Sequence, residues 1–205
     1  MHSEALTKEG AKVFKKLKAI KGFYLAGGTA LALQIGHRIS VDFDLFSNKK
    51  IKKTLLSQIE KLLAGDKIEI SVNNSDELTL FINGVKVTFL HYPFPVLKPF
   101  IKHDSFPLLS VEEIAATKAY TIGRRGSYKD YVDIFFVLSG KYTNLEDVLS
   151  FANRKYGDAF NGRLFLEQLA YWGDIKDEKI VFLGKETGLQ AVKQFFEKTI
   201  KTIKL

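Results

Sequence analysis

The feature that most constrains the fold is a pair of glycines, Gly27-Gly28, between a short apolar run and a helical pattern. The apolar run, residues 23–26, is typical of a buried strand, and the pattern over residues 29–35 is typical of a helix. Two Gly at such a junction let the backbone approach a ligand closely, and the free N–H groups of a helix start attract an anion such as phosphate. The sequence therefore predicts a sheet packed with helices and a candidate phosphate site at this junction.

Two carboxylates follow the glycine pair about a dozen residues later. Asp42 and Asp44 lie two positions apart in the alternating segment 40–46, so on a strand their side chains project from one face. Two aligned carboxylates attract a hard divalent cation, and Mg²⁺ usually takes one or two carboxylates plus substrate phosphates. Taken singly, the Gly pair predicts only a turn and the Asp-x-Asp only a solvated strand. Together they predict the phosphate cradle and metal site that transfer from a nucleoside triphosphate (NTP) requires, with Mg²⁺ or Mn²⁺ on Asp42 and Asp44.

A hairpin is predicted at Asn83-Gly84, which separates two alternating segments, 78–82 and 85–90. A two-residue turn fixes the register of both strands. In this register Thr88 lies on the face of its strand opposite to the apolar side chains.

The order of these patterns divides the chain. Strands and helices alternate in the first half, whereas the pattern becomes helical after the prolines between residues 93 and 99. We therefore expect an α+β fold, with a mixed sheet domain over residues 1–105 and a helical C-terminal domain over residues 106–205.

Composition narrows the function classes. The 205 residues include 31 Lys and Arg against 23 Asp and Glu, a formal charge of +8, which favours a polyanionic partner. The absence of Cys excludes disulfides, thiolate zinc sites, iron–sulfur clusters and a Cys nucleophile. No apolar run approaches the length of a membrane span, and the N-terminal segment does not resemble a signal peptide. We expect a soluble, cytoplasmic protein without membrane association.

The first motif also resembles that of a known family. Its residues are Gly27-Gly28-Thr29-Ala30-Leu31-Ala32-Leu33, Gly36-His37-Arg38 and Ser40-x-Asp42-x-Asp44-Leu45-Phe46. They are similar to the signature of the AbiEii/AbiGii-type nucleotidyltransferases, which are toxins of type IV toxin–antitoxin and abortive-infection systems in the polymerase-β-like superfamily. The resemblance implies a polymerase-β-like sheet domain followed by a helical bundle, with Asp42 and Asp44 as catalytic residues. It implies that the nucleotide is bound by Gly27, Gly28, Thr29, Arg38 and Ser40. For His37, a surface position is an equal expectation.

A second set of residues strengthens the resemblance. Lys118 and the segment Lys129-Asp130-Tyr131-Val132-Asp133-Ile134 are similar to the family's downstream motifs. On a helix, Lys129, Asp130 and Asp133 share a face because they are three and four positions apart. The resemblance implies that Lys118 faces nucleotide phosphates, that Lys129 and Asp130 organise the site, and that Asp133 orients a base or the accepting hydroxyl. The alternative is a surface salt bridge of little energetic weight. Under either interpretation, we expect Lys118→Ala and Lys129→Ala to cost little stability.

The sequence departs from the family's pattern at one position. Polymerase-β-like enzymes usually carry a third carboxylate on a strand near the Asp pair, and the expected position here holds Thr88. A hydroxyl cannot supply the charge of a carboxylate. Three readings remain open: a site with one metal, recruitment of Asp130 or Asp133, or a catalytically weak or inactive protein.

Three functions therefore compete. The first is a metal-dependent nucleotidyltransferase toxin that moves a nucleotidyl group from an NTP to a hydroxyl acceptor. The resemblance points to tRNA or another RNA as the acceptor and to a cognate antitoxin as a partner. The second is a nucleotidyltransferase-fold binding module without turnover, which Thr88 favours. The third is transfer to a small molecule, which the basic composition disfavours. Lysines at positions 8–21 and 49–53 are consistent with a phosphate-binding surface but do not establish one.

Overall fold

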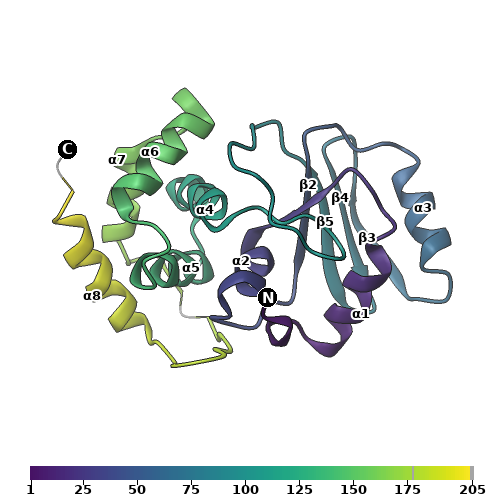
Figure 1. Ribbon diagram of the computed structural model, residues 1–205, viewed down its shortest axis with the longest axis horizontal. Coiled ribbons are helices and arrows are strands. Elements are labelled where there is room, and N and C mark those ends of the chain that lie inside the picture. Colours follow the sequence, from purple (N-terminus) through teal and green to yellow (C-terminus); the bar gives the residue numbers. More distant parts are fainter. Residues whose placement is uncertain (177, 204–205) are drawn as a thin grey trace. The chain divides into compact units, whose positions relative to one another are not determined.

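A computed structural model describes residues 1–176 and 178–203, and it divides the chain into two compact units (Figure 1). We call them the sheet unit, Met1–Ser110, and the helical unit, Val111–Leu205. The segment after residue 105 thus falls in the first unit, although the sequence places it in the second. Its backbone explains why: Leu108 forms a parallel bridge with Leu25, and the Leu109 N–H donates to the Leu25 carbonyl at 3.0 Å.

The sheet unit contains one mixed five-stranded sheet in the order β1-β2-β5-β4-β3. Neighbouring strands are antiparallel except β2 and β5, which are parallel. The strands are β1 (Tyr24–Ala26), β2 (Phe43–Ser47), β3 (Ile68–Asn73), β4 (Glu77–Ile82) and β5 (Val85–His91). A mixed sheet followed by helices confirms the predicted α+β class.

The turn between β4 and β5 has the conformation that its sequence predicts. Asn83 and Gly84 both have positive φ angles, 49° and 81°, as the two central residues of a type I′ turn require. The turn pairs Ile82 with Val85 and Thr79 with Thr88, so the predicted register is confirmed.

The two faces of the sheet differ in chemistry. Phe43 of β2 pairs with Val87 of β5, both are buried, and Phe14 stacks on the Phe43 ring with centroids 4.9 Å apart. The opposite face carries Asp44 beside Thr88. One side of the sheet therefore builds the core, and the other presents polar groups. The helical elements of this unit are η1 (Ser3–Ala5), α1 (Lys8–Leu17), α2 (Gly27–Ile35) and α3 (Leu55–Leu62).

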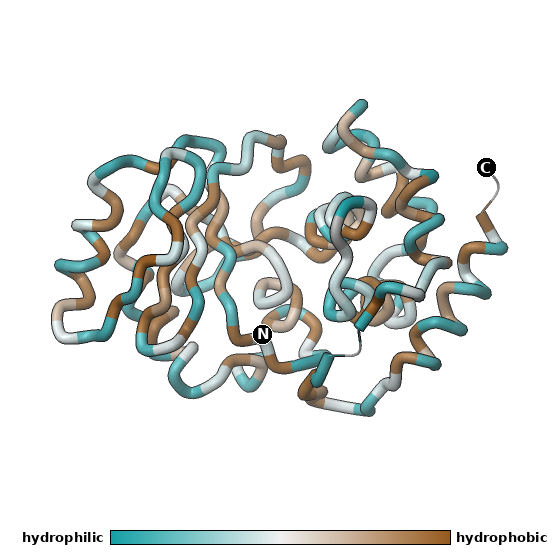
Figure 2. Tube along the Cα trace, turned by 180° about the vertical axis from the view of Figure 1, so that it is seen from behind, coloured by the Kyte–Doolittle hydropathy of each residue, from teal (hydrophilic) through white to brown (hydrophobic). Residues whose placement is uncertain are grey.

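The helical unit packs around large aromatic side chains. Tyr131, Phe165 and Phe196 are fully buried there, and Figure 2 shows hydrophobic residues (brown) interleaved with hydrophilic ones along its helices. Its elements are α4 (Val111–Arg125), α5 (Tyr128–Ser139), α6 (Leu145–Tyr156), η2 (Gly157–Ala159), α7 (Gly162–Ala170) and α8 (Leu189–Ile200). Within the described ranges, no helix is long and apolar enough to cross a membrane.

Candidate active site

The start of α2 brings a glycine and a carboxylate together. Gly27 is the first residue of α2 and has a φ of 65°, which an L side chain rarely adopts. A Cβ atom at Gly27 would overlap the Oδ2 atom of Asp44. The glycine thus lets the Asp44 carboxylate lie against the first turn of the helix, a position where backbone N–H groups and the helix dipole favour negative charge.

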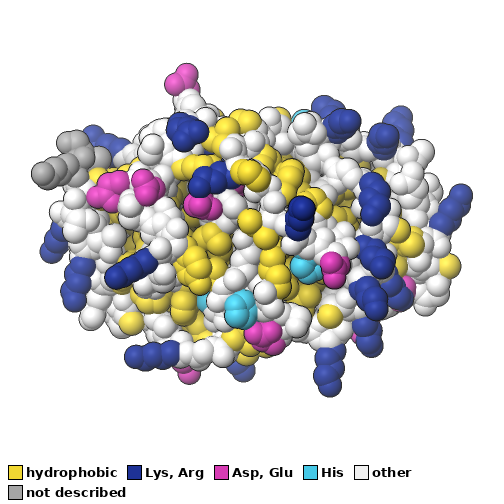
Figure 3. All heavy atoms as spheres, viewed as in Figure 1, with side chains coloured by type: hydrophobic (Ala, Val, Ile, Leu, Met, Phe, Trp, Pro, Cys, Tyr) yellow, Lys and Arg dark blue, Asp and Glu magenta, His cyan; other side chains and the backbone are white. Residues whose placement is uncertain are grey.

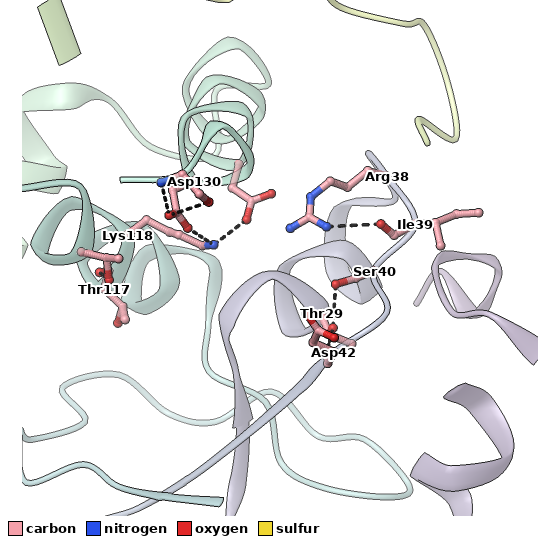
Figure 4. A network of polar contacts seen from close by, with 11 residues as sticks. Thr29, Arg38, Ile39, Ser40, Asp42, Thr117, Lys118 and Asp130 are labelled. Atoms are coloured by element: carbon pink, nitrogen blue, oxygen red, sulfur yellow. Dashed lines mark hydrogen bonds and ion pairs between the residues drawn. The ribbon is translucent and has the colours of Figure 1, made fainter. Parts of the chain in front are cut away.

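Thr29, in the same first turn, holds the segment that carries Asp42 (Figure 4). Its side chain is buried, its hydroxyl donates to the carbonyl oxygen of Asp42, and its Oγ1 lies 2.7 Å from the Oγ of Ser40. Thr29 and Ser40 therefore fix the backbone just ahead of β2. Their hydroxyls position Asp42 through its main chain.

The alternating pattern predicts that Asp42 and Asp44 both lie on the strand, and this prediction is wrong for Asp42. β2 begins at Phe43, so Asp42 precedes it and is exposed, whereas Asp44 lies within the strand and is half-buried. The later start of β2 has a local cause, because the contacts of Thr29 with Ser40 and Asp42 hold residues 40–42 outside the pairing of β2 with its neighbouring strands. The Asp42 carboxylate remains open to solvent.

Thr88 occupies the position at which a third carboxylate is expected. In the parallel pairing of β2 and β5 it is the partner of Asp44, so the two side chains share a face on adjacent strands, and this prediction is confirmed. The Oγ1 of Thr88 lies 3.2 Å from that of Thr79 on β4, and the Thr79 hydroxyl donates to Glu77 at 2.6 Å. Polar contacts thus lead from Thr88 away from β2.

The two residues His37 and Arg38, between the glycine pair and the aspartate pair, are more buried than expected. His37 and Arg38 are 5% and 4% exposed, so the surface position considered for His37 is wrong. The Arg38 guanidinium donates to the carbonyl of Ile39 at 3.2 Å. This contact anchors the guanidinium to its own backbone.

In the helical unit, three of the predicted residues form a buried cluster (Figure 4). The Lys118 Nζ on α4 lies 2.7 Å from Asp130 and 2.8 Å from Asp133, both on α5. Asp133 is fully buried, and the other two side chains are nearly so. For these three residues the surface salt-bridge interpretation is therefore wrong, because all three side chains are buried. Asp130 also accepts a hydrogen bond from the Ser127 N–H at 3.0 Å, which fixes the start of α5.

Lys129 does not join this cluster. Its Nζ pairs instead with Glu178 at 3.3 Å, and its side chain is 42% exposed. The spacing along α5 placed it on the face of Asp133, but only the two aspartates turn toward Lys118.

Sequence reasoning missed a second buried ion pair, between Glu113 on α4 and Lys155 on α6. Their side chains are fully buried, with Lys155 Nζ 2.5 Å from Glu113 Oε2. They are 42 residues apart, and no local pattern signals such a contact. Because no solvent reaches it, we assign this pair to the packing of α4 on α6.

Comparison with known proteins decides the family. Residues 15–186 match the sequence profile of a protein family described as nucleotidyl transferase AbiEii toxin, type IV toxin–antitoxin system. The chain belongs to this family. The uncharacterized protein aq_aa25 of Aquifex aeolicus (strain VF5) is 30% identical to this chain over 204 residues, and the match covers 96% of each chain.

Solved structures with the same fold include MenT4, the nucleotidyltransferase toxin Rv2826c of Mycobacterium tuberculosis H37Rv. Its TM-score is 0.63 at 16% identity, with 93% of this chain and 80% of that chain covered. JHP933 from Helicobacter pylori has a TM-score of 0.51 at 15% identity, covering 96% and 95% of the two chains. The AbiEii chain thus has the nucleotidyltransferase fold that its motifs imply.

The donor set suits a hard cation that also binds substrate. Asp42 and Asp44 lie two residues apart and could each offer carboxylate oxygens, and the described ranges hold no group of three or more His, Asp or Glu arranged for a metal. Mg²⁺ commonly takes one or two protein carboxylates and completes its shell with water and phosphate oxygens. In this AbiEii protein, Asp42 and Asp44 are the residues that could hold it.

Proposed function

We propose that this AbiEii nucleotidyltransferase transfers a nucleotidyl group from an NTP to a hydroxyl of tRNA or another RNA. The observation that carries the proposal is the approach of the Asp44 carboxylate to Gly27 at the start of α2, while Thr29 of the same turn holds the main chain of Asp42, two residues before Asp44. This arrangement joins a carboxylate pair to a helix start, the two components that NTP chemistry needs.

Asp42 and Asp44 would hold Mg²⁺ or Mn²⁺, which supplies charge neutralisation at the phosphates when bound. The chain's own groups do the positioning. Gly27 and Gly28 carry no side chains at the start of α2, so a phosphate would approach the first N–H groups of this helix closely. Thr29 and Ser40 keep the Asp42 main chain fixed, so the backbone position from which the exposed Asp42 carboxylate projects is defined.

The Lys118 cluster is the second part of the proposal. Two carboxylates hold the Lys118 ammonium in one place, with Asp133 fully buried behind it. A fixed cation can stabilise negative charge that grows on a leaving pyrophosphate. We assign Lys118 to that role and Asp130 and Asp133 to positioning it, whereas Lys129 pairs with Glu178 outside this cluster.

The type IV system to which the family belongs supports a cognate antitoxin as a protein partner. The test of the whole proposal is incubation of the purified protein with each labelled NTP, Mg²⁺ or Mn²⁺, and total tRNA. Label in the RNA supports the proposal. Label on an added small hydroxyl compound alone would favour the small-molecule enzyme, and NTP binding with no transfer to any acceptor would favour the binding module, which Thr88 beside Asp44 makes the second candidate.

A further inference from the structure

The sheet unit holds a cavity that the nucleotidyl-transfer site does not use. Its volume is about 660 Å³, within the range of about 300–1,000 Å³ typical of small-molecule sites. Residues 20–24, 47–48, 93–96, 100 and 105–107 line it, so it lies where β1 begins and β2 ends, under the loop between β5 and α4. We call it the loop pocket.

Aromatic rings form much of its wall. Phe23, Tyr24, Phe94 and Phe100 all line the loop pocket, and the Tyr24 and Phe100 ring centroids are 5.0 Å apart. Phe100 is nevertheless 41% exposed, which leaves part of its ring open to solvent. Exposed and half-buried rings around a cavity offer faces on which a flat ring can stack.

The surroundings of the loop pocket are strongly basic. The three chain segments that include its lining residues, 18–24, 47–53 and 92–107, contain eight Lys and one acidic residue, Asp104. Lys21 lies in the wall itself, and Lys49, Lys98 and Lys102 are exposed. Figure 3 shows Lys and Arg side chains (dark blue) around hydrophobic side chains (yellow) on this face of the sheet unit. Such a surface complements a chain of phosphates rather than an apolar peptide.

A polar group suited to a base edge is also present. Asn48 lines the cavity, is exposed, and its side-chain amide makes no hydrogen bond to the residues that the structure describes. An amide offers both a donor and an acceptor, which a nucleobase edge can pair with.

We propose that the loop pocket binds an unpaired nucleobase of the RNA acceptor, stacked on Phe100 and Phe94 with its backbone phosphates on the surrounding lysines. The inference rests on the proposed function for the identity of the polymer. β2 links the two sites: Asp44 and Ser47 are three residues apart on one strand, about 10 Å. One acceptor strand can therefore reach the loop pocket while its end lies near Asp44.

The test is equilibrium binding without NTP or metal, using a fluorescein-labelled single-stranded 12-nucleotide RNA and the same RNA annealed to its complement. Phe100→Ala should weaken single-strand binding at least about fivefold, because a base–aromatic stack is lost, and should leave duplex binding nearly unchanged. Ser105→Trp, which fills the cavity without removing a packed ring, should have the same effect. Tyr171→Ala, which removes an aromatic side chain that is 54% exposed in the helical unit, is the matched control and should change neither.

Unchanged single-strand affinity in both pocket variants would overturn the inference. An equal loss of NTP affinity, measured on the same variants, would also overturn it, since the pocket would then take the base of the NTP. The labelled-NTP transfer assay separates this inference from the main proposal. If the wild type transfers nucleotide to RNA but the pocket variants bind single-stranded RNA as tightly as the wild type, only the pocket inference is overturned. If the pocket variants weaken RNA binding but the wild type transfers no nucleotide, only the proposed reaction is overturned.

Discussion

At the scale of single residues, Thr88 is where this chain differs most from the pattern that its family resemblance implies. Its side chain shares a face with Asp44 on the adjacent parallel strand, as the sequence predicts for the position of a third carboxylate. We expect Thr88→Asp to tighten Mn²⁺ binding, measured by calorimetry, and to lower the thermal stability of the metal-free protein through repulsion between carboxylates.

The control for this change is Thr79→Asp. Thr79 is buried on the same face but one strand farther away, so a carboxylate there adds similar charge without adjoining Asp44. Equal Mn²⁺ affinity in the two variants would show that Thr88 is not part of the metal site.

Lys118 shows how burial changes an expectation drawn from sequence. From spacing alone, Lys118→Ala should cost little stability, but the ammonium forms buried ion pairs with two carboxylates. Removing one partner of a buried ion pair costs about 3–5 kcal/mol, so we expect a loss of this order in the free energy of unfolding, measured by denaturant titration. Lys129→Ala removes an exposed ion pair and should cost about 1 kcal/mol or less. Similar losses in both variants would contradict the buried cluster.

At the scale of elements, local signals were sufficient where a turn or cap fixes the outcome. The Asn83-Gly84 turn set the register of β4 and β5, and with it the face of Thr88. Long-range pairing was different: no pattern in the sequence indicated that β2 lies parallel to β5 or that residues 107–109 run beside β1. The sequence indicates the carboxylate pair Asp42 and Asp44. That Asp42 lies outside the strand depends on a contact of its backbone with the Thr29 hydroxyl, which only the fold reveals.

The junction of β1 and α2 gives the clearest element-scale prediction. Gly27→Ala meets both an unfavourable φ and the Asp44 carboxylate, so we expect it to destabilise the protein and to lower nucleotidyl transfer. Gly65→Ala is the control, because Gly65 has a φ of 96° but open space around its Cα. It should cost about 1 kcal/mol of stability and leave transfer unchanged. Equal effects of the two variants on stability and transfer would mean that the approach to Asp44 is unimportant.

At the scale of the whole molecule, the charge of +8 predicts a salt-dependent interaction with RNA. Logarithmic plots of single-strand affinity against salt concentration should be linear and steep. Changing Lys49, Lys50, Lys52 and Lys53 together to Gln should reduce the slope by up to about 3, because each phosphate contact contributes about 0.7 for a single strand. Fluorescence anisotropy at several salt concentrations measures the slope. An unchanged slope would place RNA binding on another surface.

The most direct measurement of the central claim is the rate of labelled NTP transfer to RNA by the wild type, Asp42→Ala and Asp44→Ala under the same Mg²⁺ or Mn²⁺ concentration. Removing either carboxylate should reduce the rate by at least about 100-fold, since even groups that only support metal ligands contribute about 10–100-fold. The melting temperature of the Asp42 variant should change little, because that side chain is exposed. If both variants transferred the nucleotide at the wild-type rate, Asp42 and Asp44 would not be the metal site of this nucleotidyltransferase.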